Sequence, residues 1–429
     1  MNSWLIKNAR DLQGEKVELM ISDGKVVAKN DLDQPYSELD AQGLTLMPGL
    51  VDLHTHLREP GREDAETVLT ASRAAVAGGY TAVSAMPNTL PVADTAGVVE
   101  QVYRLGQSHG LCDVFPIGAV TVGQEGEQLA ELVAMNQSEA RVRIFSDDGH
   151  CVADPLVMRR ALEYVKLFDG VVAQHAQDPR LTENAQMNEG EVSARLGLKG
   201  WPAVAEEAII ARDILLAEHV DSKLHICHLT TAGGVELVRQ AKLRGVKVTA
   251  EVTPHHLLLT DELAATYDAT YKVNPPLRTE NDVQALRRGL ADGTIDIVAT
   301  DHAPHPQEAK DCEWNAAAFG MLGLETAFSI CYLAMVKSGL MSVAELSLRM
   351  SGAPAKLARY KDHGNLAVGM PANFVLVDLD KSWKVDAEAL KSKSKNTPYD
   401  GMELPAVVEK TFHNGVLVYD RVNQGREGV

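Results

Sequence analysis

The chain of 429 residues is 45% hydrophobic and 23% charged, which is typical of a soluble globular protein, and no run of 18 or more apolar residues predicts a membrane span. Its length is too great for one ordinary domain unless that domain is a large barrel. The formal net charge of −18 argues against nucleic acid or an anionic membrane as a partner, and any anionic substrate must therefore be held by local positive groups.

The two ends of the chain have the same character. Residues 1–47 contain short alternating stretches with turn signals (LIKNAR, VELMISDGKVVAKN, LTLMP), and residues 365–429 contain NFVLVDLD, SWKVD and TFHNGVLVYD. Neither piece has many strands, so we predict that they pair into one small β-sandwich domain; two unrelated appendages are the alternative. Residues 1–25 carry charges throughout and no cleavage-site pattern, which predicts no signal peptide and a cytoplasmic protein.

Residues 48–364 alternate short apolar runs with helical stretches. The candidate strands are 48–54, 80–86, 112–118, 141–146, 170–175, 223–228, 246–252 and 295–300. Helices are predicted at 66–79, 204–218 and 234–244, and the first of them ends in a glycine pair. Eight buried strands alternating with helices are typical of a parallel (β/α)8 TIM-type barrel, so the predicted fold class is α/β.

Two histidines, His54 and His56, stand at the end of the first predicted barrel strand. Residues i and i+2 of an extended strand share a face, so both imidazoles point the same way. Two imidazole nitrogens at this spacing form half of a zinc site. Taken alone, the pair fits a polar strand end equally well.

Further candidate ligands follow the ends of later strands: Asp148 in the fourth, His175 in the fifth, His228 in the sixth and Asp301 in the eighth. Any one of them alone is more often structural. The carboxyl ends of all barrel strands meet at one mouth, however, so we expect these residues and the histidine pair to gather there. Imidazoles and carboxylates together suit zinc, either one ion or two ions bridged by a carboxylate and a hydroxide.

The assembled motifs resemble those of dihydroorotases of the amidohydrolase superfamily, in their long bacterial form (type I). The matching stretches are PGLVDLHTHLREPG (48–61), AMPNT (85–89), FSDDG (145–149), HICHLTTAGG (225–234), AEVTPHHLLL (250–259), KVNPPLR (272–278), IVATDHAPH (297–305) and FGMLGLETAF (319–328). They cover the predicted barrel in order. The resemblance implies a TIM barrel with a β-sandwich built from both termini, and the zinc-dependent, reversible cyclisation of N-carbamoyl-L-aspartate to dihydroorotate in pyrimidine biosynthesis.

The resemblance also implies roles for the candidate ligands. The metal ligands would be His54, His56, Asp148, His175, His228 and Asp301, with Asp301 also the catalytic acid and base. Asp148 would take the bridging position that many relatives give to a carboxylated lysine. No lysine lies near the end of the fourth strand, and we choose Asp148 over its neighbour Asp147, although strand alternation cannot decide between them in a turn.

A second group of residues matches substrate contacts of the family: His56, Arg58, Asn88, Asn274, His305, Phe319 and Gly320. Arg58 resembles the clamp for a substrate carboxylate, because guanidinium binds carboxylate in bidentate fashion. Without the resemblance, ordinary surface or capping polarity explains Arg58 and Asn88 as well. Ala318 stands where relatives often have proline, and the polar segment 306–317 is expected to be a mobile lid. The other histidines near the site (His225, His255, His256 and His302) are expected to be structural.

Two alternatives compete with this interpretation. A hydantoinase or allantoinase would act on another cyclic ureide, but Arg58 with Asn88 favours a substrate with an exocyclic carboxylate. A non-catalytic scaffold that partners aspartate transcarbamoylase would lose some ligands, whereas the full set stands here. The resemblance further implies one or two zinc ions per subunit, a homodimer and association with aspartate transcarbamoylase.

Overall fold

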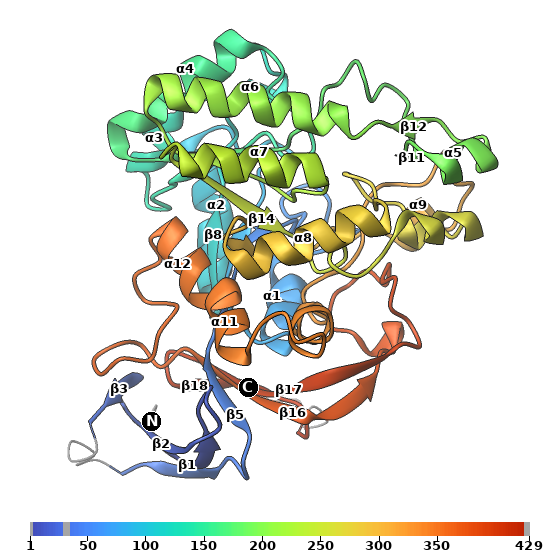
Figure 1. Ribbon diagram of the computed structural model, residues 1–429. Coiled ribbons are helices and arrows are strands. Elements are labelled where there is room, and N and C mark those ends of the chain that lie inside the picture. The colour runs from blue at the N-terminus through green and yellow to red at the C-terminus, as the bar shows by residue number, and fades with distance from the viewer. Residues whose placement is uncertain (1–2, 29–34, 424–429) are drawn as a thin grey trace.

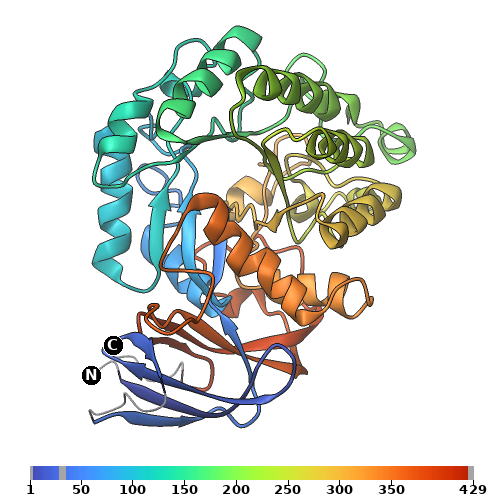
Figure 2. The same cartoon turned by 60° about the vertical axis from the view of Figure 1, so that its left-hand side comes forward.

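The computed structural model describes residues 3–28 and 35–423. Its centre is a parallel barrel of eight strands, as predicted (Figures 1 and 2). The strands are β6 (Leu50–Thr55), β7 (Tyr80–Ala85), β8 (Asp113–Pro116), β9 (Ile144–Phe145), β10 (Val171–Gln174), β13 (Leu224–Ile226), β14 (Val248–Val252) and β15 (Ile297–Val298). Two runs, β6 to β8 and β9 to β15, are joined by the parallel bridges Gly118–Phe145 and Thr55–His302, which close the barrel.

Helices surround these strands (Figure 2). The helices are α1 (Val68–Ala77), α2 (Ala96–His109), α3 (Leu132–Gln137), α4 (Pro155–Val165), α5 (Glu191–Leu196), α6 (Val204–Val220), α7 (Ala232–Leu243), α8 (Glu280–Asp292), α9 (Gln307–Lys310), α10 (Ala327–Cys331), α11 (Val343–Ser347) and α12 (Ala353–Ala358). Local chemistry sets several of their starts, because the Thr67 and Thr279 side chains cap α1 and α8 in reciprocal capping boxes. None of the helices in the described ranges is long and apolar enough to cross a membrane.

The barrel strands are shorter than predicted in places. β9 and β15 keep only two residues each of the runs 141–146 and 295–300. At these positions the chain leaves the sheet early, and its last residues become the loops that carry Asp148 and Asp301. A short parallel pair, β11 (Met187–Asn188) with β12 (Gly200–Trp201), was not predicted and lies in an excursion after β10.

Strands from both ends of the chain form one further sheet. Its order is β18 (Val416–Asp420), β17 (Glu403–His413), β16 (Phe374–Lys384), β5 (Thr45–Pro48), β1 (Trp4–Arg10), β2 (Lys16–Ser22) and β3 (Lys25–Val27), with β4 (Ser37–Asp40) beside β1. The antiparallel pairing of β5 with β16 joins the N-terminal strands to the C-terminal ones. The predicted fold class, a TIM barrel with a small β-sandwich domain from both termini, is therefore confirmed.

Several details of this sheet differ from prediction. The stretches NFVLVDLD and SWKVD fall largely in one strand, β16, which is interrupted by a shift of register between Asp378 and Ser382. β17 begins eight residues before the predicted TFHNGVLVYD stretch, and β4 was not foreseen. The end of the predicted stretch VELMISDGKVVAKN lies outside the described residues. Asn414 and Gly415 both have positive φ in the turn between β17 and β18, as tight hairpin turns require.

Candidate active site

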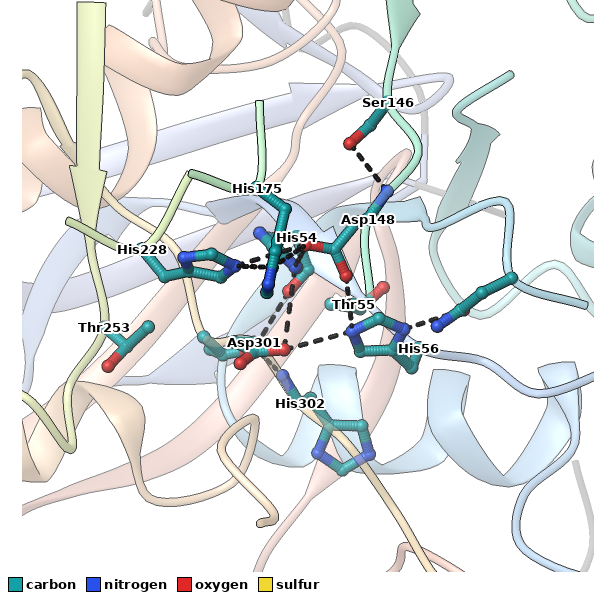
Figure 3. A network of polar contacts seen from close by, with 12 residues as sticks. His54, Thr55, His56, Ser146, Asp148, His175, His228, Thr253, Asp301 and His302 are labelled. Atoms are coloured by element: carbon teal, nitrogen blue, oxygen red, sulfur yellow. Dashed lines mark hydrogen bonds and ion pairs between the residues drawn. The ribbon is translucent and has the colours of Figure 1, made fainter. Parts of the chain in front are cut away.

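His54 and His56 lie at the carboxyl end of β6, and both are buried. Their rings meet edge to face with centroids 5.5 Å apart. The i, i+2 spacing therefore places both imidazoles inside the mouth of the barrel, as the strand geometry requires. Figure 3 shows them beside side chains from three other strand ends and the loop after β9.

The six predicted ligand side chains come together around Asp148 and Asp301 (Figure 3). His54 Nε2 lies 3.4 Å from Asp148 Oδ1 and 3.6 Å from Asp301 Oδ1. His56 Nε2 lies 3.3 Å from Asp148 Oδ2 and 3.0 Å from Asp301 Oδ1. The second pair of histidines also contacts Asp148: His175 Nδ1 and His228 Nε2 lie 3.3 and 3.2 Å from Asp148 Oδ1. The Asp148 carboxylate thus bridges two pairs of histidines.

The side chains of Asp147 and Asp148 make different contacts. Asp147 Oδ1 accepts hydrogen bonds from the backbone N–H groups of Val120 and Thr121, at 2.8 and 3.0 Å, and its other oxygen accepts from the Thr121 hydroxyl. Asp147 therefore ties the loop after β9 to the chain after β8. Asp148 alone faces the histidines, which strand alternation could not determine in this turn.

Glu251, near the end of β14, is a residue of the site that the sequence analysis missed. Its Oε1 lies 2.5 Å from His54 Nδ1, and its Oε2 lies 3.0 Å from His225 Nε2. The carboxylate accepts a hydrogen bond from each ring, so it orients His54 with Nε2 toward the cluster. Glu251 lies near the end of the predicted seventh strand, 246–252. The argument that polar residues at strand ends meet at the barrel mouth would therefore have identified Glu251 as well.

The electrostatics of the cluster keep its carboxylates ionised. Burial raises the pKa of Asp148, but the His54 charge and hydrogen bonds from His175 and His228 outweigh it, so the pKa lies well below its usual range. For Asp301, hydrogen bonding to His56 and the charge of His54 likewise outweigh burial and lower the pKa to about 2. Positive charge among these side chains is what holds both carboxylates in the anionic form.

The donor set fits a metal ion. His54, His56 and Asp148 offer ligand atoms within 4.8 Å of one another, and so do Asp148, His175 and His228. His54 Nε2 is buried and has no hydrogen-bond partner among the residues that the structure describes. A buried nitrogen that points at carboxylates without a hydrogen bond is left for a metal ion to satisfy. The cluster can therefore hold a cation, with Asp148 common to two subsites.

Arg58 and His305 lie together beside this cluster. Arg58 Nη2 is 3.2 Å from His305 Nε2, and Arg58 Nε donates to the carbonyl oxygen of Pro304 at 3.1 Å. His305 Nε2 is also 2.7 Å from the carbonyl oxygen of Phe319. Burial and the nearby Arg58 charge lower the pKa of His305 to about 3, so the ring is neutral. A buried cation and a neutral ring thus lie side by side next to the ligand cluster.

The two asparagines lie on opposite sides of the ligand cluster. Asn88 Oδ1 is 2.9 Å from His56 Nδ1, so the amide orients this imidazole. Asn274 Nδ2 donates to Gln177 Oε1 at 3.4 Å, and Gln177 Oε1 is 2.7 Å from His175 Nε2. Asn274 Oδ1 is buried without a hydrogen bond. Gln177 is a further residue that the sequence did not single out, because it follows the strand end by several positions.

The segment 306–317 is anchored by three buried residues, Lys310, Trp314 and Ala317, while seven of its twelve residues are exposed. It contains α9 and the buried Trp314, whose Nε1 donates to the carbonyl oxygen of Gln186 at 3.3 Å. Its expected motion stays a prediction. Gly320, which follows it, has φ 138°, and a Cβ there would lie 2.9 Å from His305 Nε2. Glycine at this position therefore lets the backbone approach His305 closely.

Two of the remaining nearby histidines, His256 and His302, make hydrogen bonds to neighbouring structural residues. His256 Nδ1 is 2.8 Å from the Thr253 hydroxyl and its Nε2 is 3.1 Å from the carbonyl oxygen of Pro275. His302 Nδ1 accepts a hydrogen bond from the Gly323 N–H at 3.2 Å. Burial lowers the pKa of His255 to about 4, so this ring is neutral.

Known proteins share this sequence over nearly its whole length. A family model described as "Dihydro-orotase-like" matches residues 43–233. The dihydroorotase of Streptomyces coelicolor is 64% identical over 97% of this chain and 98% of its own length. The dihydroorotase of Mycobacterium tuberculosis is 52% identical over 96% of this chain and 97% of its own. This chain belongs to the dihydroorotase family.

Solved structures of related enzymes share the fold of this dihydroorotase family member. The L-hydantoinase (dihydropyrimidinase) of Arthrobacter aurescens superposes with a TM-score of 0.87, is 26% identical and covers 98% of this chain and 97% of its own. The dihydropyrimidinase of Brevibacillus agri reaches 0.83 at 21% identity, over 97% of this chain and 95% of its own, which shows the fold alone. The two sequence relatives named above are dihydroorotases, whereas the two solved structures that share the fold are a hydantoinase and a dihydropyrimidinase.

Proposed function

We propose that this enzyme interconverts N-carbamoyl-L-aspartate and dihydroorotate. It is a hydrolase acting on cyclic amides, as its relatives at 52–64% identity are named dihydroorotases. The observation that supports this substrate best is the buried Arg58 guanidinium beside the His and Asp cluster. A guanidinium suits the exocyclic carboxylate that dihydroorotate has and that hydantoin and allantoin lack.

We propose zinc as the ion, one or two per subunit. One set of ligands would be His54, His56 and Asp301, the other would be His175 and His228, and Asp148 would be common to both sets. Four imidazoles with carboxylates are a donor set typical of zinc. When bound, zinc supplies hydroxide near neutral pH and polarises a carbonyl oxygen. Glu251 and Asn88 fix the ring orientations of His54 and His56.

In this proposal Asp301 moves the proton of the reaction. During ring opening its carboxylate takes a proton from the attacking oxygen and delivers it to the ring nitrogen that departs. During ring closure it accepts a proton from the carbamoyl nitrogen and delivers it to the carboxylate oxygen that departs. Its low pKa, about 2, keeps the carboxylate ionised and ready to accept. Arg58 and His305 hold the substrate carboxylate, while Asn274 and the Phe319–Gly320 backbone contact the ring.

A direct assay tests the proposal. The purified protein is given dihydroorotate, hydantoin and allantoin side by side, with and without a chelator, and its zinc content is measured. We expect turnover of dihydroorotate alone, lost on chelation and restored by zinc. Faster turnover of hydantoin or allantoin would identify a different cyclic amidohydrolase, and absence of both metal and turnover would restore the scaffold interpretation.

We also propose that the enzyme is a cytoplasmic homodimer that associates with aspartate transcarbamoylase. We further propose that residues 48–364 form the catalytic barrel while residues 1–47 and 365–429 form the composite domain. The pairing of β5 with β16 supports that division. Size measurement in solution, alone and with aspartate transcarbamoylase, tests the assembly, and a monomer would contradict the homodimer.

A further inference from the structure

Two buried lysines contact the segment that places Phe319 and Gly320 beside His305. Lys310 Nζ donates to the carbonyl oxygens of Lys272, Ala318 and Gly320, at 3.1, 2.8 and 2.7 Å. Both lysine side chains are buried by accessible surface, at 2% and 7% exposure for Lys272 and Lys310. Lys310 thus holds the residues on both sides of Phe319.

Lys272 secures the preceding part of the same segment. Its Nζ donates to the carbonyl oxygens of Trp314 and Ala317, at 2.6 and 2.8 Å. The same Nζ lies 4.4 Å from the centroid of the Phe319 ring, a cation–π distance. Two ammonium groups therefore determine the path of residues 314–320.

Neither lysine forms an ion pair with a carboxylate in the part of the chain that the structure describes. This is unusual in a chain of net charge −18, because burying an ammonium without a counter-charge is costly. Burial lowers the pKa of Lys272 to about 8. Burial, followed by the positive charge of Lys272, lowers the pKa of Lys310 to about 7. Asp268 and Cys312 act in the opposite direction on the pKa of Lys310 but do not outweigh these causes. The two lysines therefore place positive charge beside the segment that carries Phe319.

This positive charge lies next to the residues proposed to contact substrate. Lys272 precedes Asn274 by two positions, and Lys310 bonds Gly320, whose backbone packs against His305. The Lys310 charge also helps to lower the pKa of His305, after burial and Arg58. Its potential therefore extends to the place where Arg58 and His305 meet.

We infer that Lys272 and Lys310 are positioning residues that hold the Phe319–Gly320 backbone beside His305 and, with Arg58, supply the positive potential that an anionic substrate requires. The inference rests on the proposed function and extends it, because it assigns to two residues outside the matched substrate contacts a role in selecting charged substrates. An anionic substrate then binds more tightly when both lysines are protonated than when they are neutral. Affinity for the anion falls as pH rises through their deprotonation, because each lysine then loses its charge.

The test compares Lys310→Met with Lys310→Arg and with Lys361→Met, a control at an exposed lysine. For dihydroorotate we expect Lys310→Met to raise KM about tenfold while kcat stays within about threefold, since uniform binding is lost. Lys310→Arg, which keeps the charge, should recover much of the loss, and the control should match wild type. An unchanged KM in Lys310→Met, or an arginine variant as defective as the methionine variant, would overturn the inference.

A second measurement needs no variant. On the wild-type holoenzyme, KM for dihydroorotate should rise between about pH 6.5 and 9, and a flat KM over that range would contradict the inference even if Lys310→Met fails to fold. If the wild-type protein does not turn over dihydroorotate at all, the result would instead overturn the proposed function. The two failures are therefore distinguishable.

Discussion

At the scale of single residues, three of the proposed functional side chains sit on unusual backbone. Arg58, His228 and Asp301 have φ of 64°, 29° and 47°, although none is glycine. Such conformations cost about 1–3 kcal/mol each and persist where the surrounding structure imposes them. Here each one turns a side chain into the barrel mouth directly after a strand. Backbone strain therefore marks the same positions as the ligand chemistry.

Asp301→Asn should abolish proton transfer without disturbing the fold. We expect kcat to fall by about a thousandfold, within the range that general acid–base groups contribute. Steady-state kinetics, with circular dichroism and zinc content as controls for folding and metal binding, provide the measurement. Turnover within a few-fold of wild type would remove Asp301 from the proton-transfer role.

Arg58→Ala should weaken substrate binding more than it slows the chemical step. Losing a bidentate charge-assisted contact is expected to raise KM about tenfold or more, with a smaller change in kcat. The KM for dihydroorotate measures this. An unchanged KM would show that Arg58 does not bind the substrate carboxylate.

Glu251→Gln should weaken metal binding although Glu251 is not a proposed ligand. The carboxylate that accepts the His54 Nδ1 proton is lost, and second-shell changes of this kind cost about 10- to 100-fold in metal affinity. Competition against a chelator of known affinity measures the change. Glu236→Gln on the exposed face of α7 is the matched control, and equal affinities in the two variants would contradict the assigned role.

At the scale of elements, the positions of Asp148 and Asp301 depend on where β9 and β15 end, because both strands stop earlier than the sequence predicts. Because each strand pairs over two residues, the following turn places Asp148 and Asp301 above the sheet, facing the histidines. The loop after β9 is anchored by Asp147 to Thr121, which leaves Asp148 in one orientation. The segment around Gly320 is held similarly by lysine hydrogen bonds.

Gly320→Ala should displace that segment. A Cβ would lie 2.8 Å from the Ala303 Cβ, and the φ of 138° is unfavourable for alanine. A cost of about 1–3 kcal/mol at a substrate contact corresponds to a KM raised about tenfold. Gly339→Ala is the control, since Gly339 also has positive φ but no atom within 4 Å of an added Cβ. Equal KM values in the two variants would show that close approach at Gly320 is unimportant.

At the scale of the whole molecule, the barrel and the terminal sheet are joined by a small ionic cluster. Asp113 in β8 has Oδ2 2.8 Å from His363 Nε2 and 3.3 Å from His413 Nε2, which belongs to β17. Burial raises the pKa of Asp113, but the two histidines outweigh it and hold the pKa well below its usual range. The contact therefore links the barrel to strands from the end of the chain.

Asp113→Asn should make stability less sensitive to acid. A carboxyl whose folded pKa is depressed contributes stability above its ordinary pKa, near 4, and loses it as pH falls further. With the side chain 38% exposed, the contribution is about 1 kcal/mol, or about 2 °C in Tm at neutral pH. In thermal melts from pH 7 to about pH 2, the difference between wild type and variant should stay constant above about pH 4 and shrink below it, and a difference that stays constant throughout would contradict the linkage.

The sequence by itself determined the barrel, the order of its strands and the identity of six converging side chains. It could do so because eight apolar runs, five of them with candidate ligands at their ends, satisfy a geometry in which all strand ends meet. It also predicted that the two termini form one β domain, since neither has enough strands alone. That His54 and His56 point in the same direction followed from the two-residue repeat of a β-strand alone.

Only the tertiary structure decided which of Asp147 and Asp148 faces the histidines, because side-chain direction in a turn depends on the hydrogen bonds that anchor it. Glu251, Gln177 and the Lys272–Lys310 pair likewise act through contacts between residues remote in sequence. The long β16, predicted as two strands, follows from pairing with β17 across a shift of register. Local pattern specifies where the chain extends, but packing between distant segments specifies what each side chain meets.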